Sequence, residues 1–287
     1  SYYIILRLIN STFILCVIFS NIITHYVYKF DAKPGKHVTK MSLKNLEDYS
    51  NTEWTLTAPP KVNWVKGSGA TSDDWRKYKK IEFDALNGRT GFDNYKLLIS
   101  GIVPRPIGFI ATISKDGVHN LSPFSYFNVV NADPPVFTIG FSTTPVGLKN
   151  TPQNILDTEE LTINIISEWF VDAANETAAA APAEVDEWKL SGLTPAPSSK
   201  VKPPHVAESA FSIEAKLLYL HKLESKTVEG KHSGTVLIVE GVNFHAREDV
   251  INKDLNNIDI NKLKPVARLD GITYAVSKTG FEIPFPQ

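Results

Sequence analysis

The sequence predicts a mainly β protein built on a closed or partly closed antiparallel barrel. Short runs rich in Ile, Val, Phe and Thr recur after about residue 95, turn residues bound each run, and segments with helical character are few. Many strands at short intervals with few helices are typical of a barrel. The chain has 287 residues, enough for one sizeable domain or two small ones with a real core.

Five runs are expected to form the strands: 108–114, 135–141, 161–166, 210–225 and 233–248. The run 210–225 has a composition that also suits a helix. Its apolar residues alternate with polar ones, however, and this period of two favours a strand. Segment 115–117 ends in Gly and is typical of a hairpin turn, because Gly accepts a positive φ. Gly241 predicts a kink in the last long strand.

Helices are expected in three places around the β core. Segment 150–160 begins with Thr151 and Pro152, a favourable pair for the N-cap and first helical position. Segment 169–180 is rich in alanine, which has the highest helix propensity. Segment 249–255 is expected to form a third, short helix.

Residues 1–40 differ from the rest of the chain. Residues 2–23 are its most apolar stretch, but the uninterrupted apolar run, 13–19, is too short to span a bilayer alone. The chain does not begin with Met, and its single Met41 opens an ordinary polar segment. We therefore expect residues 1–40 to be upstream sequence read through in a gene model. A membrane anchor and a targeting peptide are the alternatives.

The charge balance argues against a nucleic-acid-binding protein. The chain carries 30 basic and 31 acidic residues, whereas nucleic-acid-binding proteins carry a basic surplus. Residues 1–40 hold five of the basic residues and one of the acidic ones, so the remainder has a net charge of −5. This balance favours a cytoplasmic location, with anchoring through residues 2–23 as the alternative. The single Cys16 excludes an intramolecular disulfide framework and a cysteine-rich metal site.

Residues 41–94 are expected to form a polar extension of the main domain. Part of it, TAPPKVNWVKGSGATSDDW, has too many helix breakers for a long helix. We expect an extended arm that ends in a short helix capped by Ser72 or Asp73. Tryptophans such as Trp64 and Trp75 are expected to anchor this arm, which would wrap the barrel or a second subunit.

Several catalytic motifs are absent from the sequence. It contains no P-loop, no Rossmann fingerprint, no G-x-S-x-G elbow and no H-E-x-x-H. The seven histidines are scattered singly, and a lone histidine is usually a structural or surface residue. Among them His245 is a minor candidate for assisting a protonation, and no metal site is expected.

The densest mixture of polar and aromatic residues lies at 119–135. Within ten residues it holds Asn120, Ser122, Phe124, Ser125, Phe127 and Asn128. A planar heterocycle needs such a mixture, since its faces contact apolar groups and its edges accept and donate hydrogen bonds. A hairpin whose hydroxyls merely satisfy its own backbone is the alternative, and composition alone favours it.

A second candidate site lies at 147–155. Lys149 supplies a positive charge, and Thr151 supplies a hydroxyl at a helix start, where free N–H groups attract an anion. Arg105 is a third cationic candidate, because a guanidinium binds phosphate with two parallel hydrogen bonds. The structural alternative for the segment 147–155 is an ordinary surface helix. The structural alternative for Arg105 is a surface ion pair.

In chain order these segments resemble the flavin-reductase-like FMN-binding split-barrel family. The matching pieces are RPIGFIATIS, KDG, HNLSPFSYFN, ADPPVFTIGF, LKNTPQNI and the closing PVARLDGITYAVS. They extend over about residues 95–280 and imply one FMN-binding domain at 95–287. The resemblance implies a six-stranded, antiparallel, Greek-key-like split barrel with a few peripheral helices. It also implies a homodimer with FMN near the subunit interface.

The resemblance assigns the cofactor-binding residues. Those implied to line the isoalloxazine and ribityl side are Asn120, Leu121, Ser122, Pro123, Phe124, Ser125, Phe127 and Asn128. Those implied on the phosphate side are Lys149 and Thr151, which match the family's Lys-Asp-Thr motif, assisted by Arg105 and Asn154. Ser114 sits where the family often has Ser or Thr facing the flavin. Two departures are Asn150, which replaces the acid of that motif, and Asp270, which replaces a Gly near Arg268 and Tyr274 in the closing motif.

The implied function is that of an NAD(P)H-dependent flavin reductase-like oxidoreductase. Electrons would pass from NADH or NADPH through bound FMN to a small-molecule acceptor. Without a Rossmann motif, the nicotinamide would have to stack directly on the flavin in an open cleft. The alternative is an FMN-binding protein without turnover, such as a flavin store, sensor or partner protein. A third reading is a membrane-anchored interaction protein dominated by residues 1–30.

Overall fold

The computed structural model describes residues 49, 53–143, 148–179, 182 and 185–286, together with the backbone of three strands nearer the N-terminus. The chain divides into two units, Ser1–Asn51 and Thr52–Gln287. The first contains the antiparallel strands β1 (Tyr3–Ile9), β2 (Thr12–Phe19) and β3 (Ile22–Tyr26). Among the described residues, no helix is both long and apolar enough to cross a bilayer. Residues 27–40 of the expected leader lie outside the described residues.

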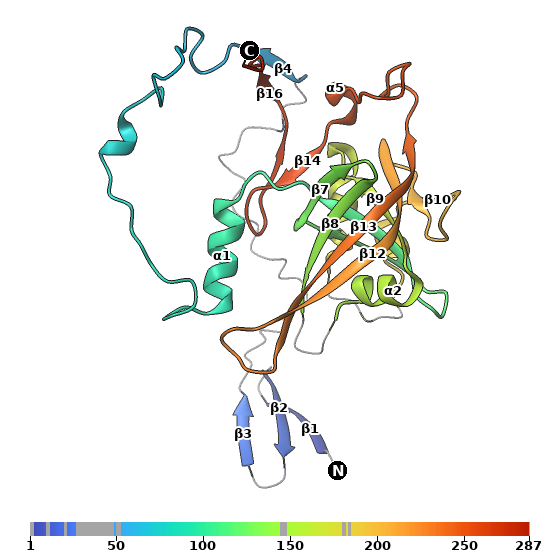
Figure 1. Cartoon of the computed structure of the whole chain (residues 1–287). Helices are drawn as coiled ribbons and strands as arrows, with labels where there is room; N and C mark the ends of the chain where they lie inside the picture. Colours follow the sequence, from blue (N-terminus) through green and yellow to red (C-terminus); the bar gives the residue numbers. More distant parts are fainter. Residues whose placement is uncertain are drawn as a thin grey trace. The chain divides into compact units, whose positions relative to one another are not determined.

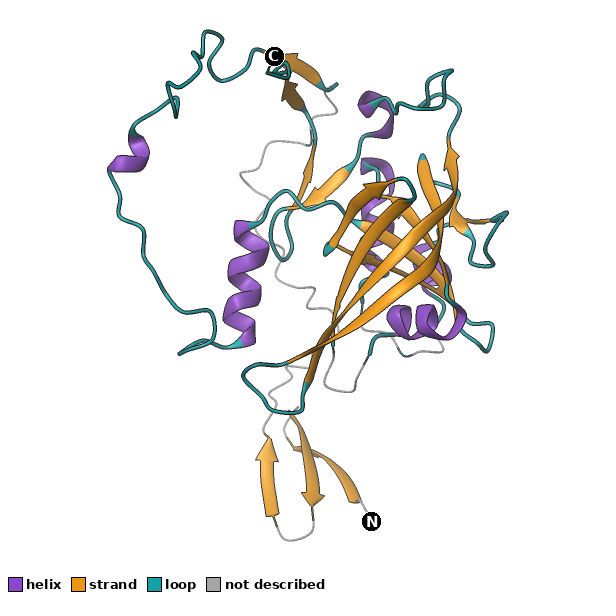
Figure 2. Ribbon diagram, viewed as in Figure 1, coloured by secondary structure: helices purple, strands orange, loops and turns teal. Residues whose placement is uncertain are grey.

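A seven-stranded antiparallel sheet forms the body of the second unit (Figure 1). Its spatial order is β6-β5-β9-β12-β13-β8-β7. The strands are β5 (Gly108–Ile113), β6 (His119–Phe124), β7 (Phe127–Ala132), β8 (Pro135–Ser142), β9 (Glu160–Ile165), β12 (Phe211–Glu224) and β13 (His232–Ala246). The sheet curls into a barrel that is left unpaired between β6 and β7 (Figure 2). The mainly β, split-barrel prediction is therefore confirmed.

The strand count differs from the expected six. The polar and aromatic segment at 119–135 contains the two strands β6 and β7, because a bend at Ser125 and Tyr126 separates them. All five runs predicted as strands are strands in the structure, including 210–225. The alternation of apolar and polar residues in that run therefore identified the strand correctly, where composition alone also suited a helix.

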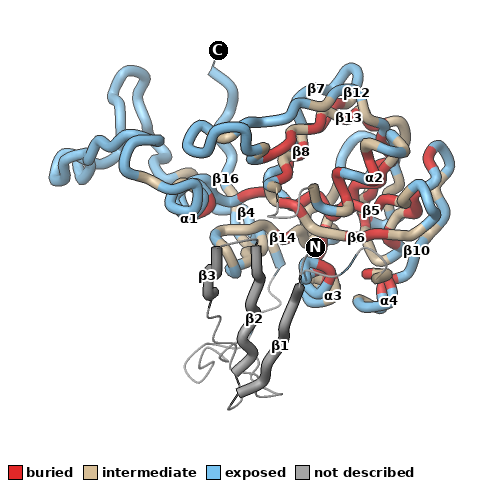
Figure 3. Tube along the Cα trace, turned by 90° about the horizontal axis from the view of Figure 1, so that it is seen from below, coloured by how far each residue is buried: buried red, intermediate tan, exposed pale blue. Residues whose placement is uncertain are grey.

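Strand β5 is buried on both of its faces. Successive side chains of a strand point to opposite sides, so Ile110 enters the barrel core while Phe109 and Ala111 face outward. The outward residues pack in a second cluster with Phe170 and Trp188 from the helical segments that follow β9. Burial on both sides explains the nearly continuous apolar run of β5. Figure 3 shows the buried residues concentrated on the sheet strands.

The long hairpin β12–β13 contains the predicted irregularity at Gly241. Glu214 pairs with Asn243 but Ala215 pairs with Gly241, so β13 carries one extra residue at this point. Such a β-bulge bends the strand and increases its twist. A Cβ on Gly241 would lie 3.1 Å from Phe137 Cε2 and 3.2 Å from Ile213 Cγ2, which is too close for easy packing. Glycine therefore allows the bent strand to close onto the core.

The helices are short and peripheral. They are η2 (Asp74–Arg76), α1 (Gly91–Gly101), α2 (Asn150–Thr158), η3 (Glu168–Phe170), α3 (Val171–Glu176), α4 (Glu187–Ser191) and α5 (Ile260–Leu263). The prediction of a helix at 249–255 is wrong, since this segment forms turns and an isolated β-bridge between Ile251 and Ile258. Helix α1 was not expected, although its capping box of Thr90 and Asp93 is a readable signal.

The short strands lie outside the main sheet. They are β4 (Thr55–Thr57), β10 (Pro195–Ala196), β11 (His205–Val206), β14 (Val266–Arg268), β15 (Tyr274–Val276) and β16 (Thr279–Phe281). Strand β4 pairs in parallel with β16, so the start of the N-terminal extension is tied to the C-terminal segment. Trp54 lies beside Gly280 in this pairing, which leaves no room for a larger residue there.

Residues 58–90 form an arm that runs out from the body and returns to it at α1 (Figure 1). The expected extended arm with a short helix is present, as η2, and the Ser72 hydroxyl accepts a hydrogen bond from the N–H of Asp74. Trp64 and Trp75 do not anchor the arm on its own body, and anchoring on a second subunit stays a prediction. They are 49% and 61% exposed.

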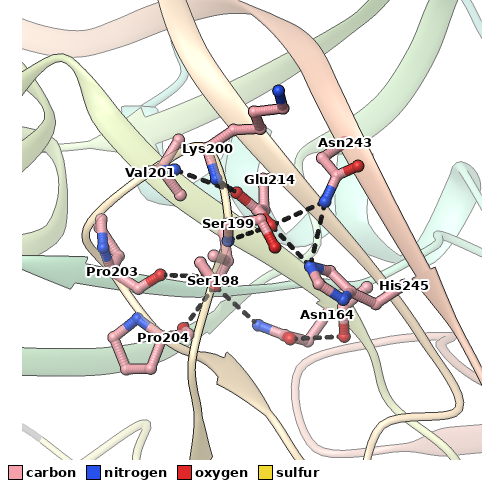
Figure 4. Close-up of polar contacts among 12 residues, drawn as sticks. Asn164, Ser198, Ser199, Lys200, Val201, Pro203, Pro204, Glu214, Asn243 and His245 are labelled. Carbon is pink, nitrogen blue, oxygen red and sulfur yellow. Dashed lines mark hydrogen bonds and ion pairs between the residues drawn. The ribbon is translucent and has the colours of Figure 1, made fainter.

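The side chain of Glu214 holds the loop before β11 against the sheet (Figure 4). This carboxylate is fully buried and accepts hydrogen bonds from the backbone N–H groups of Ser199, at 2.8 Å, and Val201, at 3.0 Å. It also accepts from Asn243 Nδ2 at 2.9 Å and His245 Nε2 at 2.6 Å. Burial by itself would raise the pKa of Glu214, but these bonds outweigh it and lower the pKa to about 2.

We predict that Glu214→Gln weakens the fold and removes an acid-dependent part of its stability. The Glu214 carboxylate has a lower pKa folded than unfolded, so it stabilises the fold above its ordinary pKa of 4.5. That contribution, at most about 3 kcal/mol, is lost as the pH falls toward 2. Urea unfolding from pH 7 to pH 3 measures it. The exposed carboxylate of Glu224 on the same strand provides the control, Glu224→Gln. Equal pH profiles for both variants would contradict the prediction.

Candidate functional site

Helix α2 is attached to the β5–β6 hairpin by a buried network of amides and hydroxyls. Thr151 Oγ1 donates to Asn120 Oδ1 at 2.7 Å, and Asn154 Nδ2 donates to Thr112 Oγ1 at 3.0 Å. Thr112 Oγ1 in turn donates to Asn120 Oδ1 at 3.3 Å. All four side chains are buried. The structure thus brings together three predicted residues, Asn120, Thr151 and Asn154.

Thr112 is the member of this network that the sequence analysis missed. It lies within the apolar run of β5, where a single hydroxyl gives little sign of a function. The sequence does give one indication of its role. A hydroxyl on a central strand is expected to be buried, and a buried hydroxyl needs a polar partner. That partner comes from α2, which lies more than thirty residues later in the chain.

Helix α2 begins two residues earlier than predicted. Its first residue is Asn150, its N-cap is Lys149, and no side chain caps it. The expectation that Thr151 is the N-cap is therefore wrong, because the Thr151 hydroxyl is used by Asn120 instead. Lys149 is exposed, with its Nζ 5.7 Å from the centre of the Phe124 ring. An uncapped helix start beside a lysine is electrostatically suited to an anion.

A cavity of about 530 Å³ opens at this helix start, and we call it the first cavity. It is lined by Ser114, Lys115, Asp116, Val118, Asn120, Leu148, Lys149, Asn150, Gln153, Asn154 and Asp157. Four of these were predicted as cofactor-binding residues: Ser114, Asn120, Lys149 and Asn154. Within the described part of the chain, Asn120 Nδ2 donates no hydrogen bond, so this donor is available to a ligand.

A second cavity, of about 430 Å³, adjoins the first at Ser114, Lys115 and Asp157. Its further wall includes Lys202 and Pro203, from the loop that Glu214 holds in place. Ser114 supports the turn between the two cavities, since its hydroxyl accepts hydrogen bonds from the N–H groups of the turn, at 3.0–3.2 Å. The Ser114 hydroxyl is therefore engaged with the protein itself.

Strand β6 separates the other predicted residues onto its two faces. Asn120 faces α2, whereas Leu121 is fully buried in the cluster under α3 and α4. Pro123 and Ser125 line a third cavity of about 110 Å³ on the opposite side from Asn120, together with Arg268 and Tyr274.

The rest of the segment lies outside these three cavities. Phe124 and Phe127 pack in the barrel core, and Ser122 is half-buried on β6. Asn128 is exposed on β7, where its Oδ1 accepts the N–H of Val129. The predicted segment therefore does not line a single site, although its cofactor contacts remain predictions of the resemblance.

Arg105 is buried and engaged by the protein itself. Its Nη1 donates to the carbonyl oxygens of Ile99 and Ile102, the latter at 2.9 Å. Its Nε donates to Ser125 Oγ and its Nη2 to the Asp270 carbonyl, both at 3.3 Å. Arg105 thus joins α1, β6 and the closing segment, and the structure does not place it at the first cavity.

The closing motif has a similar structural arrangement. The Arg268 guanidinium lies 4.3 Å from the centre of the Tyr274 ring, and the Tyr274 hydroxyl donates to Asn175 Oδ1 at 2.8 Å. Asp270, which departs from the family pattern, contributes its backbone carbonyl to Arg105. This departure therefore leaves the contact intact, because the contact uses the backbone and not the side chain.

His245 is likewise occupied away from the first cavity. Its Nε2 donates to Glu214, and its ring stacks on His205 with 4.0 Å between the ring centres. Burial, followed by the nearby His245, lowers the pKa of His205. Over the described ranges, no group of three or more His, Cys, Asp or Glu side chains is arranged to hold a metal ion.

Comparison with known proteins gives this geometry a context. Residues 100–262 match the family model described as "Flavin reductase like domain". An uncharacterized protein of Aquifex aeolicus is 38% identical over 182 residues, which cover 63% of this chain and 88% of that protein.

Solved structures of flavin-related proteins are also similar to this chain. Nitrilotriacetate monooxygenase component B from Bacillus cereus is 34% identical, with a TM-score of 0.68, covering 72% of this chain and all of that one. Flavoredoxin of Desulfovibrio vulgaris is 25% identical, with a TM-score of 0.51, covering 61% of this chain and 87% of that one. The family match extends over more than half of the chain, from the end of α1 to α5. The chain therefore belongs to the flavin reductase-like domain family, and its function is a flavin-related oxidoreduction.

Proposed function

We propose that this chain is an FMN-binding oxidoreductase that takes electrons from NADH or NADPH and passes them through bound flavin to a small-molecule acceptor. One observation carries the proposal. The first cavity presents Lys149, an uncapped helix start and the Nδ2 donor of Asn120 together, in a chain of the flavin reductase-like family. A cavity of about 530 Å³ lies within the usual range for small-molecule and cofactor sites.

The residues of the first cavity fit the polar end of FMN, which carries a phosphate and a chain of hydroxyls. Lys149 and the N–H groups at the start of α2 would hold the phosphate. The amides of Asn120 and Asn154 would hold the ribityl hydroxyls, because the buried network fixes their orientation. Asn150 at the cavity rim adds no negative charge that would oppose the phosphate.

The bound flavin supplies the redox chemistry, and the protein supplies binding and orientation. No side chain of the first cavity has to act as a general acid or base. The second cavity adjoins the first and offers room for the electron donor or acceptor, with Lys115 and Lys202 on its walls. The hydrogen bonds of Glu214 to the backbone of 199–201 would keep that wall in place during turnover.

We also propose that the chain is a homodimer, as the family resemblance implies. The edge strand β7 supports this, because all its residues after Phe127 are exposed. Sheet edges that remain open are prone to pair with another chain, and native proteins usually cover them.

We predict that Lys149→Gln weakens the binding of FMN about tenfold, the effect of losing roughly 1.4 kcal/mol from a charge-assisted contact. Binding of riboflavin, which lacks the phosphate, should be unchanged. Fluorescence titration of both flavins measures this. Lys253→Gln, at an exposed turn outside the cavities, is the control and should alter neither affinity. An equal loss for both flavins would place the phosphate elsewhere.

We predict that the purified chain with added FMN shows a bound flavin spectrum and that NADH or NADPH bleaches it. Visible absorption under anaerobic conditions measures the bleaching, and denatured protein with FMN is the control. Bound flavin that stays oxidised would favour the alternative of an FMN-binding protein without turnover. The absence of any bound flavin would refute the proposed function.

A further inference from the structure

The arm at 58–90 carries a row of large apolar side chains that contact no core. The exposed ones are Val62, Trp64, Val65, Trp75, Tyr78, Ile81, Phe83 and Leu86. In the described chain no residue from 53 to 98 is buried. Scattered exposed hydrophobic residues are normal, but this many along one segment mark an interaction surface. The arm has no use in the proposed flavin chemistry, so its apolar residues need another explanation.

Local contacts within the arm arrange several of these aromatic residues. Trp64 Nε1 donates to the Gly69 carbonyl at 2.8 Å. Arg76 lies 4.4 Å from the centre of the Trp75 ring. These contacts orient the two rings while leaving them about half exposed, and an arranged aromatic side chain loses little entropy when a partner covers it.

The body carries an uncovered apolar face of its own, on α1 and β7, which we call the α1–β7 face. Its exposed members are Phe92, Tyr95, Leu98, Ile102, Tyr126, Val129 and Val130. The members from α1 recur at helical spacing on one side of the helix. Arg105 donates to the Ile102 carbonyl at the end of α1 and to Ser125 Oγ next to Tyr126, so the end of the helix and the start of β7 lie close together. The face is thus continuous from α1 to the open sheet edge.

We propose that the arm of one copy of this chain lies across the α1–β7 face of a second copy, and that the two arms are exchanged in a twofold dimer. This builds on the homodimer proposed above and names the segments that form it. A twofold arrangement covers both arms and both faces at once, because each copy supplies one of each.

Length and charge favour a second copy as the occupant. The arm has 33 residues, close to the 20–30 that each side contributes to a standard stable interface. It carries seven Lys and Arg against four Asp and Glu, whereas residues 91–287 carry 17 against 23. A basic arm and an acidic body attract each other and speed correct docking. At its N-terminal end the arm is tied to its own body by the pairing of β4 with β16, and at its C-terminal end it leads into α1 (Figure 1).

Photo-crosslinking of the full chain tests this. The photoreactive residue p-benzoylphenylalanine replaces Tyr78 of the arm in one sample and Ile272 of the closing segment in the other. Tyr78 and Ile272 are each 80% exposed, so they are matched in access. The expected result is a covalent dimer from position 78 only, with the crosslink in peptides 91–103 or 126–132. Crosslinks within one chain, or to another surface, would overturn the proposal.

A second measurement keeps this test separate from the flavin proposal. In the Tyr78→Ser, Ile81→Ser double variant, sedimentation should show at least a tenfold weaker dimer, while Ile272→Ser should leave it unchanged. FMN titration of the same samples reports on the first cavity independently. A crosslinked dimer that binds no flavin would refute the proposed function and leave the arm exchange standing. An unchanged dimer in the double variant would overturn the arm exchange whatever the flavin result.

Discussion

The arrangement of the barrel depends on the burial of the β5–β6 hairpin from both sides. Phe109 and Leu121 point toward the helices outside, while Ile110 and Phe124 point into the barrel. A strand covered on both faces has no solvent side, so any polar side chain on it must be satisfied by a neighbouring element. The hydroxyl of Thr112 and the amide oxygen of Asn120 meet this condition through α2.

The candidate site is a consequence of that condition. Helix α2 is attached where the hairpin needs polar partners, and its start is therefore fixed beside the turn at 115–117. Because Thr151 bonds the hairpin, it does not cap its own helix, and the helix start stays open. Thr151 thus satisfies a buried amide oxygen in a helix whose start is left without a side-chain cap, the arrangement on which the proposed phosphate binding depends.

Sequence reasoning recovered the strands well because alternation and turn residues are local signals. It also found Asn120, Lys149, Thr151 and Asn154, which the structure brings to one place. It failed where the outcome depends on a distant partner. Thr151 was predicted to be a helix cap, but its hydroxyl donates a hydrogen bond to Asn120, thirty-one residues earlier in the chain. Residues 120–128 looked like one surface, but strand alternation and the break at Ser125 send them to different sides.

The Glu214 hydrogen bonds have a further consequence for how this protein can change over evolution. The carboxylate binds its loop by accepting hydrogen bonds from main-chain N–H groups, which every residue except proline possesses. The side chains of Ser199, Lys200 and Lys202 are exposed and take no part in these hydrogen bonds. Lys202 lines the second cavity, so a relative that exchanges this side chain changes the charge of the cavity wall without altering the loop that carries it. Glu214 would then keep the backbone of the loop constant while the exposed side chains on it vary.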